Sequence, residues 1–319
     1  MKLQWDILLN DDARFPRLLF FAEFSDDRFR YGINSELQYC LFFDFGAKAG
    51  NISVEPVVRA NISLEEKIED GKPSLILTLL NDNARNLFND LIISIVSQTR
   101  EIKSGSVKAG FISICNDWFD LFEPLTGQLS HSDLQGIFAE LSFLKYLMAN
   151  SRLPYNEILS SWKGPYGKRH DFELGENHFE IKSIAEFKQT ANISSEYQLD
   201  WLEGQKLLLG VSEFGGDKSE QITIGVLVSE ITTTLRAVTG VKINLFYTAL
   251  NKAGLDQNAL NDYDHHTFAI VSTRWYNCTL QGFPALKRSL LPDAVRNIKY
   301  ELALGSIKQY LINDLTHLI

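Results

Sequence analysis

The stretch KRHDFELGENHFEIK, residues 168–182, constrains the fold of this 319-residue chain more than any other. Two short runs, RHDFEL and HFEIK, alternate polar with apolar residues on either side of Gly-Glu-Asn. Such period-two alternation is typical of two strands joined by a tight turn. It places Phe179 and Ile181 on one face of the second strand, and Glu180 and Lys182 on the other. We therefore expect a β-hairpin with one apolar face and one face of charged groups.

The turn of this hairpin decides which side chains lie opposite each other. If Glu176-Asn177 is a two-residue turn, Asp171 lies across from Lys182. Glu173 then lies across from Glu180. A three-residue turn shifts the pairing by one and needs a bulge to restore it. In either register, the polar groups gather at one end of the hairpin.

An amphipathic helix is predicted from Ser132, in SDLQGIFAELSFLKYLMAN. Its apolar residues recur with helical spacing, at Leu134, Ile137, Leu141, Leu144 and Met148. At about 100° per residue, Glu140 falls about 60° from Ile137, inside the apolar arc. A buried carboxylate is costly unless it is paired. Glu140 therefore either reaches water at the edge of the arc or joins other acids.

Composition places the chain among ordinary folded proteins, with 45% hydrophobic and 22% charged residues. No apolar run approaches the ~18 residues of a membrane span, and the N-terminus lacks the pattern of a signal peptide, so we expect a cytoplasmic protein. The net charge of −9 argues against a broad basic surface but leaves room for a local basic cleft. Three distant cysteines without CxxC spacing indicate reduced, buried thiols.

The length suggests two domains, or one large domain with an extension, and a Pro/Gly/Ser-bearing segment at 123–133 is the predicted linker. Residues 1–125 are predicted to form a β-rich domain with one or two helices. Its short apolar runs predict strands at 17–24, 37–45, 53–60 and 74–80, followed by helices at 81–101 and 106–123. Residues 126–319 are predicted to form the second domain. Beyond the hairpin we expect strands at 205–214, 266–277 and 297–304, and helices at 223–238, 243–254 and 305–319.

The charged face of the hairpin has the chemistry of a metal site. Two carboxylates a few ångströms apart, here Asp171 and Glu180, repel unless a proton or a cation lies between them. Mg²⁺ suits such a gap because it prefers oxygen ligands and keeps waters for phosphate. The main-chain carbonyl of Ile181 lies between Glu180 and Lys182 and can also face the metal. Lys182 can hold or help to deprotonate an attacking water.

These residues resemble the PD-(D/E)XK nuclease superfamily, typified by restriction endonucleases. Asp171 is followed by FEIK, which reads as (D/E)-x-K, on a hairpin that comes after a Glu-bearing helix. The resemblance implies a mixed α/β (α+β) fold with a restriction-endonuclease-like core, a mixed sheet flanked by helices. It implies Asp171 and Glu180 as metal-binding acids and Lys182 as the catalytic lysine. Glu140 matches the acid that many members supply from the preceding helix, whereas His170 stands where the motif has Pro.

Further segments, from QGIFAELSFLKYLM to GFPALKRSLLPDAVRNIKYELAL, resemble a bacterial PD-(D/E)XK family associated with restriction and phage-defence gene clusters. This resemblance implies an endonuclease that uses Mg²⁺, or Mn²⁺ in its place, on double-stranded DNA. It also implies partner proteins from such a cluster, and a homodimer is plausible because a double cut needs two active sites. Gln198 would be a polar residue near the cleft, or else a surface amide. An alternative is a catalytically inactive subunit of the same fold that binds DNA or protein.

Several residues near the motif have two interpretations. Lys168 and Arg169 could contact the DNA backbone, and Trp162 could stack on a base or pack within its loop. His170 and His178 could join the site, but they are expected at the surface of the hairpin. A His-His pair at 265–266 could ligate a metal or lie in an exposed loop. The acids and Lys182 could also form a surface salt bridge of little consequence.

Overall fold

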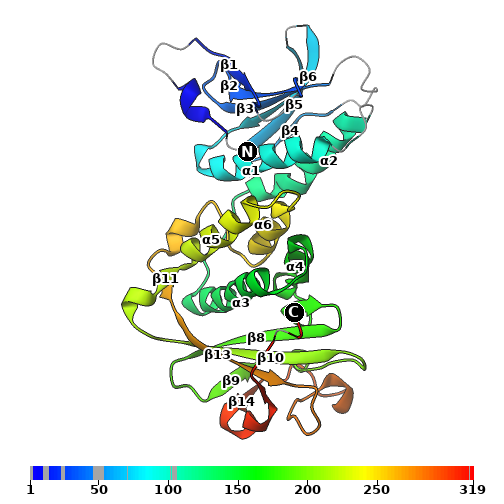
Figure 1. Cartoon of the computed structure of the whole chain (residues 1–319), viewed down its shortest axis with the longest axis vertical. Coiled ribbons are helices and arrows are strands. Elements are labelled where there is room, and N and C mark those ends of the chain that lie inside the picture. The colour runs from blue at the N-terminus through cyan, green and yellow to red at the C-terminus, as the bar shows by residue number, and fades with distance from the viewer. Residues whose placement is uncertain are drawn as a thin grey trace. The chain divides into compact units, whose positions relative to one another are not determined.

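The structure, a computed structural model, describes residues 3–9, 14–22, 26–45, 54–69, 71–100, 102, 106–315 and 317–319. Its contacts divide the chain into two compact units, Met1–Leu125 and Thr126–Ile319 (Figure 1). In the described residues, no helix is long and apolar enough to cross a membrane. The three cysteines are buried and free, as predicted.

The N-terminal unit contains a six-stranded antiparallel sheet with the order β1-β2-β3-β6-β5-β4. Its strands are β1 (Arg17–Phe20), β2 (Phe29–Ile33), β3 (Tyr39–Asp44), β4 (Val57–Val58), β5 (Ile62–Glu69) and β6 (Lys72–Leu79). Two helices follow, α1 (Arg85–Thr99) and α2 (Val107–Phe119). Phe111 of α2 stacks on Phe43 of β3, with ring centroids 5.1 Å apart, so α2 packs against the sheet.

The four strands predicted in this unit are present. Three are shorter than predicted, β6 starts two residues earlier and ends one residue earlier than predicted, and β2 and β5 are additional. Residues 23–24, 53 and 101 of the predicted elements lie outside the described residues. β5 was missed because its outward positions carry Glu and Lys. Only Ile62 and Leu64 mark its buried side.

The second unit is built on a five-stranded mixed sheet with the order β15-β13-β10-β8-β7. The strands are β7 (Phe172–Leu174), β8 (Asn177–Ala185), β10 (Lys206–Phe214), β13 (Ile270–Asn277) and β15 (Leu311–Ile312). β8 and β10 are parallel, and the other neighbours are antiparallel. β10 lies at the centre, where both faces are covered, and its apolar run KLLLGV fits that position.

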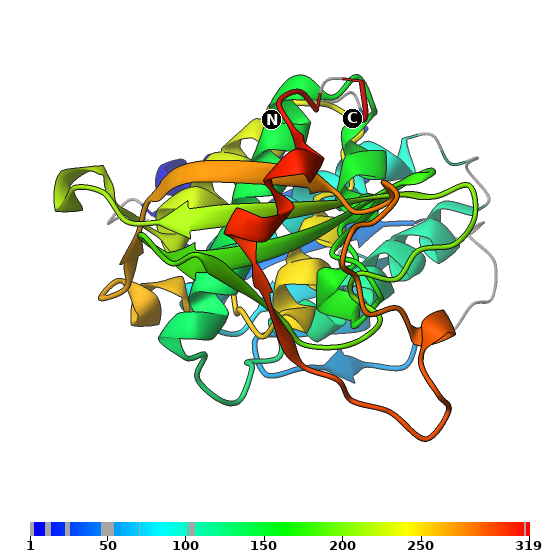
Figure 2. The ribbon, with the colours of Figure 1, turned by 90° about the horizontal axis from the view of Figure 1, so that it is seen from below.

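Helices cover one face of this sheet and a small β-layer covers the other. α3 (His131–Asn150) and α4 (Tyr155–Ser161) lie against the sheet, and α5 (Ile224–Arg236) and α6 (Ile243–Lys252) pack on those two helices. On the opposite face, β9 (Thr190–Ile193) pairs with β14 (Tyr300–Ala303). In Figure 2, β14 and the following 3₁₀ helix η9 (Leu304–Tyr310), both red, cross in front of the sheet. The predicted restriction-endonuclease-like class, a mixed sheet flanked by helices, is confirmed.

The hairpin is present, but its predicted register is wrong by two residues. The turn is Gly175-Glu176, and Glu173 pairs with His178 instead of Glu180. Gly175 has φ of +60°, a conformation that glycine adopts at no steric cost and that suits the first position of a hairpin turn. The positive φ that Gly175 adopts therefore places the turn one residue earlier than the predicted Glu176-Asn177.

The predicted closing helix at 305–319 is also wrong. In the described part of this segment, from which residue 316 is left out, the helical structure is a 3₁₀ helix that ends at Tyr310, and the next two residues form β15. Leu311 pairs with Tyr276 of β13, so the chain adds a strand to the edge of the sheet. Edge pairing satisfies backbone groups that a short terminal helix would leave open.

Candidate active site

Four of the predicted residues come together where β7 begins: Glu140 of α3, Asp171 just before β7, and Glu180 and Lys182 of β8. Gly164, in the loop between α4 and β7, marks where two of them meet. A Cβ added to Gly164 would lie 2.6 Å from Glu140 Oε2 and 3.0 Å from Asp171 Oδ1. The two carboxylates thus face the same point, and only a residue without a side chain fits between them.

Asp171 is fixed by the edge of the sheet. Its Oδ2 accepts a hydrogen bond from the main-chain N–H of Ile181 at 2.7 Å. Its own main-chain carbonyl accepts from the N–H groups of Lys163 and Gly164, at 2.7 and 3.0 Å. β7 begins only at Phe172, so the Asp171 carboxylate takes the place of a strand partner for Ile181. Because the N–H and C=O of one strand residue point to the same side, the Ile181 carbonyl also points to this edge.

Glu180 and Lys182 form a buried ion pair on one face of β8. Lys182 Nζ donates to Glu180 Oε1 at 2.6 Å. Glu180 is 1% exposed, whereas the Lys182 side chain keeps 15% exposure. The second oxygen, Glu180 Oε2, is buried and has no hydrogen-bond partner among the described residues. A buried carboxylate oxygen without a donor is costly, so this atom is suited to a ligand that brings positive charge.

The three carboxyl groups have raised pKa values because they are buried close to one another. Burial and the neighbouring Asp171 raise the pKa of Glu180 to about 8, against the opposing effect of Lys182. Burial and Asp171 also raise the pKa of Glu140 well above its ordinary value. Burial raises the pKa of Asp171, although Lys182 and the Ile181 N–H oppose this.

Lys182 responds in the opposite direction to the acids around it. Burial by itself lowers the pKa of its amine, but attraction to Glu180 and Asp171 outweighs burial and leaves the pKa raised. Lys182 therefore stays protonated while the acids compete for protons. Such displaced pKa values in a cluster are typical of functional sites.

Trp162 is a member of the site that the sequence left undecided between base stacking and loop packing. Its indole N–H donates to Glu140 Oε2 at 2.6 Å, and its ring stacks against Phe172. With 1% exposure it has no face open for a base, so packing is the correct interpretation. It holds the Glu140 carboxylate in place. The signal in the sequence was a tryptophan close to the motif, since a buried indole N–H needs an acceptor.

We expect Gly164→Ala to destabilise the protein by about 1–3 kcal/mol, because the new methyl group would displace the Glu140 carboxylate from the Trp162 indole. Urea unfolding monitored by circular dichroism measures this change. Gly136→Ala is the matched control, because Gly136 lies in α3 with no neighbouring side chain within 4 Å. The free energy of unfolding of that control should rise by up to about 1 kcal/mol, because alanine has a higher helix propensity than glycine. Equal unfolding midpoints for the two variants would contradict the close fit at Gly164.

The residues predicted to bind substrate have other contacts. Arg169 lies 3.7 Å from the Asp200 carboxylate, and Lys168 is exposed. Gln198 Oε1 accepts from the N–H of Ser194 at 2.8 Å and so closes its own loop. A role for these residues in DNA binding stays a prediction.

The expectation that His170 and His178 lie at the surface is wrong, because they are 1% and 7% exposed. The hairpin face that carries them is covered, and His170 Nε2 lies 2.9 Å from the main-chain carbonyl of Asp200. Burial, helped by His178, lowers the pKa of His170 to about 4. His265 is exposed, in the loop that the sequence indicated.

Comparison with known proteins places this geometry in a family. The model of a family described as "Putative PD-(D/E)XK family member, (DUF4420)" matches residues 5–305. A search of curated proteins and a search of solved structures each return no match. The family match spans nearly the whole chain and confirms the resemblance drawn from the motif. This protein therefore belongs to the PD-(D/E)XK family described by that model.

Proposed function

We propose that this protein is a Mg²⁺-dependent endonuclease that hydrolyses phosphodiester bonds in double-stranded DNA. The observation that carries the proposal is the meeting of three carboxylates and one amine at the edge of the sheet, with Glu180 Oε2 buried and lacking a donor. PD-(D/E)XK enzymes typically use divalent metals. An all-oxygen donor set around an orphaned carboxylate oxygen fits Mg²⁺, with Mn²⁺ as a substitute.

In this proposal Asp171, Glu180, Glu140 and the Ile181 carbonyl hold the ion. Bound Mg²⁺ lowers the pKa of a water and neutralises charge that builds on the phosphorus. Asp171 is oriented for this role by the Ile181 N–H, and Glu140 by the Trp162 indole. Each acid is held before substrate arrives, so little reorganisation is needed during the reaction.

Lys182 is proposed to act on the attacking water and the phosphate. Its ammonium group is paired with Glu180 at 2.6 Å, yet the side chain keeps 15% exposure and can reach a ligand in the cleft. A metal on Glu180 would compete with Lys182 for the carboxylate and leave the amine for substrate. Lys182 then donates to the phosphate or holds the nucleophilic water in place.

The proposed setting is restriction or phage defence, in the cytoplasm, as the family resemblance suggests. Because the net charge is −9, attraction to DNA must come from a local basic surface or from a partner protein of the same gene cluster. A homodimer would bring two active sites to the two strands. The alternative is an inactive subunit that keeps the fold and binds DNA or protein, and the experiment below separates the two.

We expect the purified protein to cut plasmid or phage DNA in Mg²⁺ or Mn²⁺ and not in a chelator. Asp171→Asn should lower the rate by at least about 100-fold, because it weakens a metal contact worth several kcal/mol in the transition state. Glu230→Gln is the control, since Glu230 of α5 forms an exposed ion pair with Lys145 of α3. Methylated and unmethylated DNA are compared, with and without neighbouring gene products.

Two results would contradict the proposal. Cleavage by Asp171→Asn at the wild-type rate would mean that another site or a contaminant acts. Mg²⁺ binding without cleavage of any substrate, under all these conditions, would favour the inactive DNA- or protein-binding subunit.

A further inference from the structure

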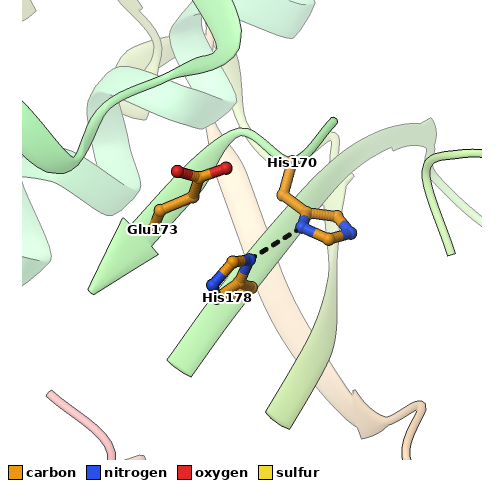
Figure 3. A group of neighbouring side chains, drawn as sticks. All are labelled: His170, Glu173 and His178. Carbon is orange, nitrogen blue, oxygen red and sulfur yellow. Dashed lines mark hydrogen bonds between the residues drawn. The ribbon is translucent and has the colours of Figure 1, made fainter. Parts of the chain in front are cut away.

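We infer that His170, Glu173 and His178 form a second metal site in this protein, suited to a transition-metal ion such as Zn²⁺. The three side chains come from the residue before Asp171, from β7 and from β8. Figure 3 shows the two imidazole rings meeting at their nitrogens, with the Glu173 carboxylate beside them. The inference does not depend on nuclease activity.

The distances between the ligand atoms fit one ion. His170 Nδ1 lies 2.9 Å from His178 Nδ1. One ligand atom from each of the three residues lies within 4.8 Å of the other two. Two nitrogens on a tetrahedral Zn²⁺, each at about 2.0–2.1 Å, are about 3.3 Å apart. A small rotation of the rings and of the Glu173 side chain is therefore enough to bind the ion.

The outer contact of His170 has the form found at metal-binding histidines. His170 Nε2 lies 2.9 Å from the Asp200 carbonyl, which can only accept, so Nε2 carries the proton. That tautomer leaves the lone pair on Nδ1, which faces His178. A ligating histidine commonly donates its other N–H to a main-chain carbonyl in this way, and the contact fixes the direction of the ring.

The burial and chemistry of the cluster favour a borderline ion over Mg²⁺. Both histidines are almost fully buried, whereas Glu173 is only partly buried and leaves a side from which water can complete the coordination. Two imidazoles and one carboxylate match Zn²⁺ or another first-row transition metal, whereas Mg²⁺ prefers an all-oxygen set.

This site is separate from the acidic one. Glu173 of β7 is two residues after Asp171, and His178 is two residues before Glu180 on β8. At about 3.3 Å per residue the two centres are offset by about 7 Å, beyond the roughly 3.5–4 Å of a two-metal catalytic pair. An ion here would tie the residue before Asp171 to β8 and so hold the start of β7 in place.

The test is calorimetric titration of the chelator-treated full-length protein with Zn²⁺, in excess Mg²⁺ to occupy the acidic site. We expect one tight site for Zn²⁺. His178→Ala should lower its affinity for Zn²⁺ by at least about 10–100-fold, because removal of a hydrogen-bond partner of a metal-binding residue already causes a loss of that size. Co²⁺ in place of Zn²⁺ should give visible absorption in the wild type that is absent in His178→Ala. The matched control is the double variant His131→Ala/His266→Ala, which removes an exposed pair whose Nδ1 atoms lie 3.1 Å apart.

If circular dichroism shows that His178→Ala is unfolded, Glu173→Gln replaces it. Glu173 is only partly buried, and glutamine has the same size as glutamate. Retained affinity in the control and lost affinity in these variants support the site. The inference is overturned if folded wild type binds no Zn²⁺, or if binding survives in the folded site variant and disappears with His131 and His266.

Discussion

Lys182→Met is expected to lower the rate of DNA cleavage by about 10²–10⁴-fold, the usual contribution of one positioned proton donor or acceptor. Methionine keeps much of the length of the side chain but removes the ammonium group that lies 2.6 Å from Glu180. Mg²⁺ affinity should stay the same or rise, because the three acids lose a competing cation. Single-turnover cleavage and calorimetric Mg²⁺ titration measure the two effects separately.

The matched control is Lys145→Met, which removes an amine of the same type from an exposed pair with Glu230 at 2.8 Å. Exposed pairs contribute about 0–1 kcal/mol, so this control should cut DNA at the wild-type rate. A Lys182→Met variant that binds Mg²⁺ and cleaves as fast as the control would remove Lys182 from the mechanism.

The second large effect is on stability, and it depends on pH. The pKa of Glu180 is about 8 in the folded protein, against an ordinary value of 4.5 that represents the unfolded chain. Between these values the folded state holds a proton that the unfolded state releases. The contribution of Glu180 to the free energy of unfolding therefore falls as pH rises from about 5 to 8. The lowered pKa of His170 acts in the opposite direction only below about pH 6.5, so the fall is clearest between pH 6.5 and 8. The raised pKa of Lys182 acts only at higher pH, where its contribution is lost, and so does not alter this window.

Glu180→Gln should remove the contribution of Glu180 to this slope, while the raised pKa values of Glu140 and Asp171 keep the remainder. Without metal, the variant should match the wild type near pH 5 and exceed its stability by a few kcal/mol near pH 8, because glutamine never becomes charged. Urea unfolding in a chelator, at several pH values, measures the difference. Excess Mg²⁺ should flatten the slope of the wild type more than that of the variant, which lacks one of the proposed ligands.

Glu230→Gln again serves as the control and should keep the wild-type slope, since Glu230 is exposed. A wild-type protein whose stability without metal rises steadily from pH 5 to 8 would show that the carboxylates are better solvated than their burial indicates. The carboxylates of the acidic cluster would then not require a bound cation to offset their charge.

Backbone periodicity was enough to predict the direction of three of the four clustered side chains. Alternation along HFEIK placed Glu180 and Lys182 on one face of β8, because side chains of a strand point to opposite faces in turn. Helical spacing set Glu140 inside the apolar arc of α3, where a lone acid needs a partner. The mixed sheet followed from the same motif through its family resemblance.

Only the tertiary structure decided what lies around these residues. The hydrogen-bond donor to Glu140 comes from Trp162. A side chain does not fit at Gly164 because two carboxylates meet there. His170 is buried where its ring meets the main chain of Asp200. Periodicity depends only on neighbouring residues within one segment, so it can be determined from a single sequence. Burial, hairpin register and the pairing of an acid with a distant donor depend on which segments pack together, and local spacing does not encode that.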